Sequence, residues 1–507
     1  MVFDFIAASY KKYMRYYLSN LIVDENETVE SLKQKISNRL LIPVTSFRYQ
    51  ILLKESFYSF SKLRTKVDLE IETSEFIRDT SLSFVLEQKS FSFVPRKLKN
   101  RPIIYGATLS GLYAGLYFAR CGLNPIIVDP CTDFSSINIK DIKNSNENNC
   151  LSDPLFYGGY LDFSSSSSIT SFLKKDIEER INIKLGYERY YFITSTQTFL
   201  LANSLKEEII SLGGEFYFSS FIKSAKTLFG NLKSIDIRTP EGIITFKCNC
   251  LFISLLNNCP LIKKEDIDTY LGFCFQNKER DVKNALYGNY RIRKYPLFIE
   301  HPDKNSSSSW INVFPLPSSL CPYVDLFGNR NVSLRVKEDN NLGYYSGILL
   351  KKLDKKDMPT SIDIDAFIYS LLTSGYRSYS MALPCSNVDE FLHKEEPYKM
   401  GVLKGDFDQG LFLSSMSSLL NNELSLSFNK KIYELIRHYP FFFSTSIIVS
   451  GFYIYRRLKP GVVSSNFGLS NCKGIYSLIN ENNRPMDVSN ASFNGLKVAF
   501  DYLSNQY

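Results

Sequence analysis

The sequence predicts an α/β protein built on a doubly wound parallel sheet with a β-meander, together with a second α+β domain and a small N-terminal α+β domain. Three observations predict this fold class. Residues 101–130 pass from a short apolar run through a helical pattern to a second apolar run. A helix and four strands are expected over 197–255, and one more strand and helix over 474–502. With 507 residues, two or three domains are expected.

The N-terminal unit is predicted to span residues 1–95. Its pattern favours a strand at 17–23, a helix at 29–40, strands at 46–54 and 69–72, and a last element near 82–86. It contains no cluster of chemically reactive residues. The first twenty residues are basic, with one acidic side chain, which fits either a degenerate targeting segment or a first amphipathic helix.

Residues 101–130 have the size of a dinucleotide-binding β-α-β crossover. We expect a strand at 102–105, a helix at 109–120 and a second strand that ends in Asp129. The turn at Gly106 would aim backbone N–H groups at a pyrophosphate, and the start of the helix would add its positive dipole end. Asp129 stands where an acidic side chain would bind the adenosine ribose.

The glycine pattern of this turn is incomplete. A full fingerprint is G-x-G-x-x-G, and this chain has Gly106 and Gly111 but places Thr108 at the middle glycine. A Cβ and a hydroxyl at that position weaken or reshape the contact with a phosphate. The local pattern therefore also fits an ordinary β-α-β unit that binds no nucleotide.

The rest of the chain is expected to complete this sheet and to insert a second domain. Residues 132–168, rich in Ser and Asn, are typical of a flexible surface insertion. We expect one sheet to contain residues 103–105, 126–128, 251–253 and 475–476. The predicted domains are 96–260, the first part of the dinucleotide-binding domain; 261–440, a second, substrate-like domain; and 441–507, the C-terminal part of the dinucleotide-binding domain.

Composition excludes several functional classes. Hydrophobic residues make up 44% and charged residues 22%, which is typical of a globular protein, and a net charge of +8 without a basic block does not favour nucleic-acid binding. The ten cysteines lack metal-site spacing and the three histidines are far apart, so no metal site is predicted. No apolar run is long enough for a transmembrane helix. We expect a soluble protein of a reducing compartment, either cytoplasmic or organellar such as a plastid.

Three segments resemble a family of uncharacterised FAD-dependent dehydrogenase-like proteins, distant relatives of two-dinucleotide-fold flavoproteins found in bacteria and plastid-bearing eukaryotes. The segments are 101–130, 204–218 and 474–503, and the likeness covers nearly the whole chain, including the N-terminal domain. The resemblance implies an FAD/NAD(P)-binding, Rossmann-like fold with FAD as the possible cofactor; whether NAD(P) binds is left open. By that resemblance the cofactor-binding residues are Gly106, Ala107, Ser110, Gly111, Asp129, Asn480 and Glu481.

The sequence departs from the family where the cofactor would be held. The glycine-rich turn before the last helix is 478–483 without glycine, an Ala-Thr-Gly is replaced by 254–256, and the glycine-rich segment near the flavin ring is reduced to a region around 158–159. Two hypotheses follow: an FAD-dependent oxidoreductase with a degenerate flavin site, or a pseudoenzyme that keeps the fold as a structural or assembly scaffold. No catalytic base is predicted, and His301 and Cys274 are expected to be ordinary residues. The substrate, the electron partner, any protein partner and the oligomeric state stay open.

Overall fold

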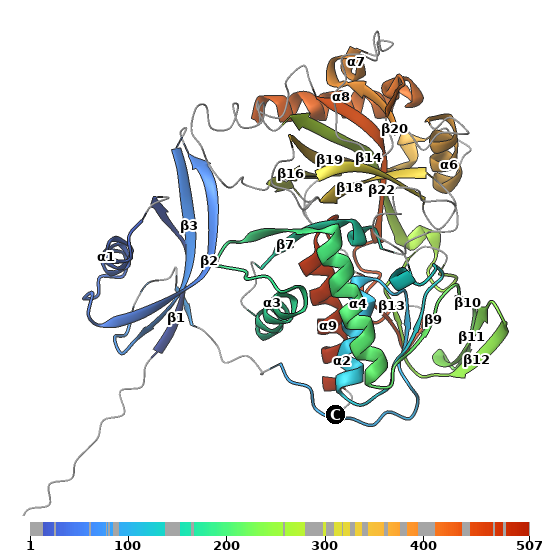
Figure 1. The fold of residues 1–507 in the computed structure, drawn as a ribbon, viewed down its shortest axis with the longest axis horizontal. Coiled ribbons are helices and arrows are strands. Elements are labelled where there is room, and N and C mark those ends of the chain that lie inside the picture. The colour runs from blue at the N-terminus through green and yellow to red at the C-terminus, as the bar shows by residue number, and fades with distance from the viewer. Residues whose placement is uncertain are drawn as a thin grey trace, which may run out of the picture.

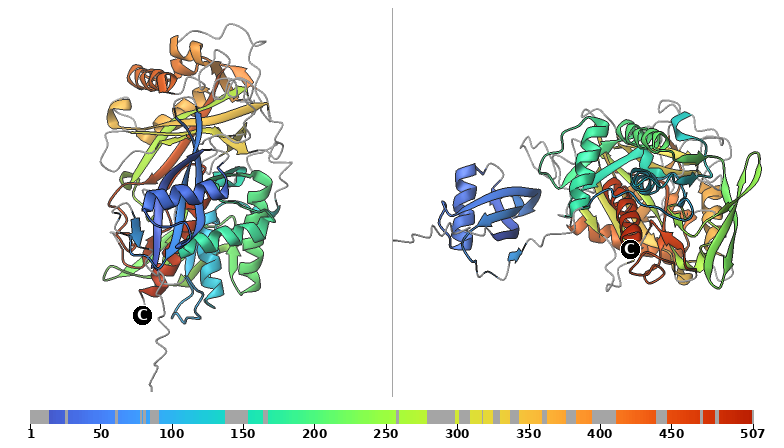
Figure 2. Two further views of the ribbon diagram at one scale, coloured as in Figure 1. Left: turned by 90° about the vertical axis from the view of Figure 1, so that its left-hand side faces the viewer. Right: turned by 90° about the horizontal axis from the view of Figure 1, so that it is seen from below.

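The structure is a computed structural model, and it forms three groups of elements: a small N-terminal domain, a parallel-sheet domain and a second domain (Figure 1). Figure 2 shows the N-terminal domain set to one side of the other two. The residues that the structure describes are 14–24, 27–59, 62–77, 79, 82–84, 91–136, 153–163, 167–256, 259–278, 298–300, 309–316, 318–324, 330–336, 343–358, 363–375, 383–393, 411–438, 447–469, 472–479 and 483–505.

The N-terminal domain is a four-stranded sheet with one helix. Its strand order is β2-β3-β1-β4, and apolar side chains of the helix, among them Leu32 and Ile36, share a buried core with the sheet. The helix begins after Thr28, whose side chain accepts a hydrogen bond from the N–H of Ser31. Met14 begins β1, which contains the strand predicted at 17–23, so the amphipathic helix, one of two alternatives for the first twenty residues, is wrong for 14–20. The elements are β1 (Met14–Asp24), α1 (Val29–Leu40), β2 (Phe47–Ser59), β3 (Lys62–Thr73) and β4 (Leu82–Phe84).

The parallel-sheet domain confirms the predicted strands. Five strands in the order β23-β13-β5-β6-β9 pair in parallel, and the four that were predicted to share one sheet are neighbours in it. The three central strands, β5, β6 and β13, are short apolar runs that are fully buried, as expected for a sheet that is covered on both faces. The strands are β5 (Ile103–Tyr105), β6 (Ile126–Val128), β9 (Glu215–Tyr217), β13 (Leu251–Ile253) and β23 (Ile475–Ser477).

The two faces of this sheet are covered by different kinds of structure. Ile104, Ile127 and Phe252 pack with the helices, whereas Ile103 and Leu251 pack with the meander. Among the described elements, helices thus cover one face and the predicted meander covers the other. The helices are α2 (Leu109–Arg120), α3 (Ser168–Ile181), α4 (Ser195–Ser211) and α9 (Val488–Ser504); the meander is β10 (Phe221–Leu228), β11 (Asn231–Thr239) and β12 (Gly242–Lys247).

The second domain has a seven-stranded sheet in the order β15-β16-β19-β14-β22-β20-β21, beside a β17–β18 hairpin. Because β22 (Ile448–Leu458) pairs with β14 in this sheet, the assignment of all of 441–507 to the dinucleotide-binding domain is wrong, and the chain rejoins the parallel sheet only at β23. The other elements are β14 (Ile267–Lys278), β15 (Phe298–Glu300), β16 (Trp310–Leu316), β17 (Ser318–Val324), β18 (Arg330–Val336), β19 (Tyr344–Lys352), β20 (Leu383–Asn387), β21 (Leu411–Leu413), α6 (Ile364–Gly375), α7 (Val388–His393) and α8 (Asn422–His438).

Part of the predicted surface insertion belongs to the core. Within 132–168, the structure describes a 3₁₀ turn η3 (Pro154–Tyr157) and a strand β7 (Gly158–Asp162), which pairs antiparallel with β8 (Tyr190–Thr194). Phe156, Tyr160 and Leu161 are fully buried, so the expectation of a surface loop is wrong for 153–163. The residues on both sides of 153–163 are mainly polar, and this composition is typical of a surface loop. Residues 137–152 and 164–166 of the expected insertion lie outside the described residues.

Two further observations concern the whole described chain. None of the helices that the structure describes is both long and apolar enough to cross a membrane. The nine described cysteines are free thiols, and eight of them are buried. Cys274 lies in β14, and burial raises the pKa of its thiol well above the usual value, as expected of a core residue and not of a nucleophile.

Candidate dinucleotide site

The turn between β5 and α2 brings the predicted adenosine-end residues together. Gly106, Ala107, Ser110, Gly111 and Asp129 all lie here, and all are buried. Gly106 has a φ of +106°, which favours glycine. The other two predicted contacts, Asn480 and Glu481, lie outside the described residues.

Thr108, the residue in place of the middle glycine, is the N-cap of α2. Its backbone is extended, and its Oγ1 accepts a hydrogen bond from the N–H of Gly111 at 3.2 Å. It also lies 3.0 Å from Oγ of Ser110. The N–H of Gly111 could donate to a phosphate at this helix end, but here it donates to the Thr108 side chain.

The Asp129 carboxylate holds the turn itself. Its Oδ2 accepts a hydrogen bond from the N–H of Ala107 at 2.5 Å, and its Oδ1 accepts one from the N–H of Cys131 at 2.8 Å. The residue is 1% exposed. Both carboxylate oxygens thus bind buried backbone donors, and one of these donors belongs to the glycine turn.

A second carboxylate, that of Asp153, binds the N-terminal end of α2. Its Oδ2 accepts a hydrogen bond from the N–H of Leu109, the first residue of α2, at 3.0 Å. Its Oδ1 accepts one from the N–H of Leu155 at 2.9 Å and so caps η3. Burial raises the pKa of Asp153 to about 6, although both backbone hydrogen bonds oppose that shift.

The prediction from sequence did not include Asp153. The Asp-Pro pair at 153–154 is a local signal for a capped turn. That signal says nothing of the contact with α2, which joins residues 44 positions apart. An anionic group at a helix N-terminus is favourable, and here the chain supplies that group itself.

The glycines of the turn also have a packing role that needs no ligand. Oγ of Ser254 lies 2.7 Å from the carbonyl oxygen of Gly106. A Cβ on Gly106 would lie 2.6 Å from this hydroxyl, and a Cβ on Gly111 would lie 2.1 Å from the Gly106 carbonyl oxygen. Ser254, the first residue at one of the altered family positions, therefore packs into the turn. Close packing within the protein is therefore enough to require glycine at both positions.

The segment around Gly158 and Gly159 is also packed closely against another part of the chain. A Cβ on Gly159 would lie 2.2 Å from the carbonyl oxygen of Met486, and the N–H of Tyr160 donates to that same oxygen at 2.8 Å. Strand β7 thus lies directly against the turn that precedes α9. By the family resemblance, the segment around Gly158 and Gly159 is the one that approaches the flavin ring. Residues 480–482 of the turn expected to wrap the rest of the cofactor lie outside the described residues.

Buried charges stand beside this contact. Asp487 caps α9 by accepting a hydrogen bond from the N–H of Asn490 at 2.9 Å, and burial raises the pKa of its carboxyl to about 7. Arg484 donates to Asp162 at 2.9 Å, and Arg189 lies 3.3 Å from the same carboxylate. Arg189 also binds Glu55 of β2 at 2.6 Å. The charges therefore pair within the protein and tie the N-terminal domain to β7.

The residues present do not fit a pyrophosphate at the β5–α2 turn as it stands. A dinucleotide phosphate needs the N–H groups at the start of the helix, and those of Ala107, Leu109 and Gly111 bind Asp129, Asp153 and Thr108. A phosphate there would also meet two buried carboxylates. Like charges in a site of low dielectric repel strongly.

Comparison with known proteins gives distant likenesses. No family model matches this chain. An uncharacterized protein of Clostridium beijerinckii is 22% identical over 308 residues, which cover 57% of this chain and 54% of that protein. The chain therefore spans about half the length of the curated relative it matches.

Several solved structures are similar over most of the chain. A flavoprotein/dehydrogenase from Cytophaga hutchinsonii has a TM-score of 0.37 and 11% identity, covering 80% of this chain and 79% of that chain. A p-nitrophenol 4-monooxygenase from Pseudomonas putida has a TM-score of 0.36 and 9% identity, covering 79% and 77%. A glycine oxidase from Bacillus cereus has a TM-score of 0.33 and 10% identity, covering 81% and 96%. At these TM-scores, the likeness assigns neither a site nor an activity to this chain.

Proposed function

We propose that this chain is a scaffold that keeps the Rossmann-like fold of a dinucleotide-binding flavoprotein and has exchanged its cofactor contacts for contacts within the protein. The observation that carries the proposal is the buried Asp153 carboxylate on the N–H of Leu109. This carboxylate supplies, from within the chain, the negative charge that the helix end would otherwise receive from a phosphate.

The other contacts support the same proposal. The Asp129 carboxylate accepts hydrogen bonds from the N–H groups of Ala107 and Cys131 and is 1% exposed, so in this fold it holds the turn itself. Gly159 lies against the Met486 backbone. The chain thus packs against itself both at the β5–α2 turn and at Gly159. In this proposal the protein acts through the surfaces of its three domains and carries out no redox chemistry.

The alternative is an FAD-dependent oxidoreductase with a degenerate flavin site and an unknown substrate. It is favoured by the meeting of Gly106, Gly111 and Asp129 in one β-α-β turn. In this alternative those residues, with Ala107 and Ser110, would hold the adenosine end of FAD. It requires Asp153 to leave α2 when the cofactor binds.

Flavin content separates the two functions. The chain is expressed with riboflavin supplied, purified, and denatured with acid, and released flavin is measured by fluorescence. The scaffold proposal predicts a colourless protein with no released flavin, and a melting midpoint that added FAD does not raise. Flavin in a near-equimolar amount, or a midpoint that rises with FAD concentration, would establish binding to the folded state and defeat the proposal.

A further inference from the structure

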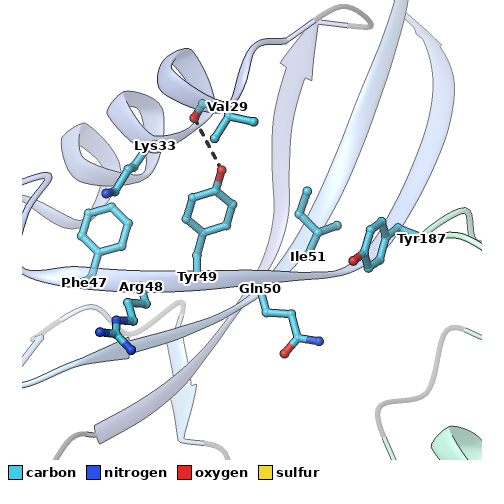
Figure 3. Close-up of a pocket in the computed structure, with 8 residues that line it drawn as sticks. All are labelled: Val29, Lys33, Phe47, Arg48, Tyr49, Gln50, Ile51 and Tyr187. Carbon is cyan, nitrogen blue, oxygen red and sulfur yellow. Dashed lines mark hydrogen bonds between the residues drawn. The ribbon is translucent and has the colours of Figure 1, made fainter.

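The N-terminal domain has a groove along the edge strand of its sheet (Figure 3). Its volume is about 480 Å³, and it is lined by β2 residues, by Val29 and Lys33 of α1, and by Tyr187 from the parallel-sheet domain. Val29 is 67% exposed and Tyr187 is 51% exposed. Large apolar and aromatic side chains thus face solvent on both sides of this groove.

The edge of β2 already accepts one segment of the chain as a strand. The N–H of Lys54 donates to the carbonyl oxygen of Tyr187 at 2.5 Å, and the N–H of Arg189 donates to the carbonyl oxygen of Lys54 at 2.7 Å. Residues 187–189 therefore run parallel to β2, with Lys54 opposite Glu188. Among the described residues, no strand continues this pairing along 47–51, since β2 is the outer strand of its sheet.

The groove begins where this short pairing ends. In Figure 3, Phe47, Tyr49 and Ile51 project from β2 toward α1, whereas Arg48 and Gln50 project from the opposite face. Tyr49 Oη donates to the carbonyl oxygen of Val29 at 3.4 Å, which fixes one wall. An edge strand with exposed backbone groups and adjacent side-chain pockets is how sheets bind extended peptides.

The charge of the lining residues indicates what kind of peptide segment the groove would bind. Lys33 is the charged lining residue on the α1 side of the groove, and Arg48, the other charged lining residue, projects from the opposite face of β2. The Lys33 ammonium lies 5.9 Å from the centroid of the Phe47 ring, at the end of the groove away from Tyr187. An acidic side chain beside an apolar one would complement this arrangement.

We propose that this groove binds an extended segment of a partner protein, which adds to β2 as a strand next to residues 187–189. The segment places an apolar side chain between Val29, Tyr49 and Tyr187, and an acidic side chain toward Lys33. The proposal goes beyond the scaffold function and stands apart from it, because none of the residues that line the groove belongs to the β5–α2 turn.

The test uses the full chain and a phage library of random ten-residue peptides. Enriched peptides are synthesised with a fluorescent label and titrated by fluorescence polarisation. We expect them to alternate apolar with other residues and to contain Asp or Glu. Binding should weaken about tenfold or more in Tyr187→Ala and in Lys33→Glu. Lys247→Glu, the same charge change at an exposed position of β12, is the matched control and should bind as the wild type does.

Amide hydrogen exchange gives a second readout. Bound peptide should slow exchange of backbone N–H groups in 47–51 and leave those of β12 unchanged. A library that yields no enriched peptide overturns the proposal, as do peptides that bind all variants equally. A concentration-dependent dimer that Tyr187→Ala dissociates, without peptide binding, would show that a second copy occupies this edge. None of these results depends on flavin content, so the two proposals fail separately.

Discussion

The N–H of Leu109 donates a 3.0 Å hydrogen bond to Oδ2 of Asp153, a residue from a different element that is 6% exposed. This contact joins the first residue of α2 to the turn before β7. It occupies the position at which a dinucleotide-binding helix presents its N–H to a phosphate. The chain has therefore satisfied the helix terminus internally, and the following predictions test what depends on that contact.

Replacing the Asp153 carboxylate should destabilise the protein. Asp153→Ala leaves the N–H groups of Leu109 and Leu155 buried without their acceptor, which should lower the free energy of unfolding by about 1–3 kcal/mol. Asp153→Asn keeps one acceptor oxygen and should lose less. Urea denaturation at pH 8 measures both. Equal losses in the two variants would show that the hydrogen bonds do not carry the stability.

The charge of Asp153 should make stability depend on pH in a known direction. Its folded pKa is raised from 3.8 to about 6, so folding favours the protonated form. The corresponding stabilisation is complete below about pH 4 and is lost as the pH rises through about 6, by up to about 3 kcal/mol. Wild type should therefore lose stability relative to Asp153→Asn between pH 4 and pH 7, as measured by urea denaturation across that range. A constant difference between the two proteins would contradict the raised pKa.

Thr108 should matter as a helix cap. Thr108→Ala removes the oxygen that accepts from the N–H of Gly111 and should lower the free energy of unfolding by about 1 kcal/mol. Thr108→Ser retains a hydroxyl and is the matched control. Thermal denaturation by circular dichroism compares the two. If the Ala variant has the same melting temperature as the wild type, the hydroxyl has no capping role.

The contact between β7 and the turn before α9 should leave no space for a side chain at Gly159. Gly159→Ala places a Cβ 2.2 Å from the Met486 carbonyl oxygen, and the resulting backbone shift should cost about 1–3 kcal/mol. Gly343→Ala is the control, since a Cβ there meets nothing within 4 Å. Urea midpoints of the two variants measure the difference. Similar midpoints would mean that β7 and this turn are not in close contact.

The parallel sheet was predictable because its strands are short apolar runs bounded by turns, and a sheet covered on both faces requires them. The same reasoning failed for β22, because an apolar strand carries no signal of which sheet it joins. It failed for β7 because the two glycines and the neighbouring serines resemble a loop, although Tyr160 and Leu161 are fully buried.

Only the part of the site that lies within the β-α-β crossover was predictable from the sequence. The meeting of Gly106, Gly111 and Asp129 follows from the β-α-β crossover, which places the turn beside the end of the next strand. What these residues bind did not follow from the pattern, because the decisive acceptor, Asp153, comes from a distant turn. Thr108 has a local role that the glycine fingerprint did not indicate, because its hydroxyl is the N-cap of α2.

The most direct test of the central claim is an FAD titration of wild type and Asp153→Ala by equilibrium dialysis. If Asp153 occupies the phosphate position and Asp129 holds the turn, wild type binds no FAD and retains its fold without it. Asp153→Ala frees the N–H of Leu109 and removes a buried negative charge, so any FAD binding should appear in this variant first. Saturable binding of FAD to wild type, no weaker than to Asp153→Ala, would contradict the account.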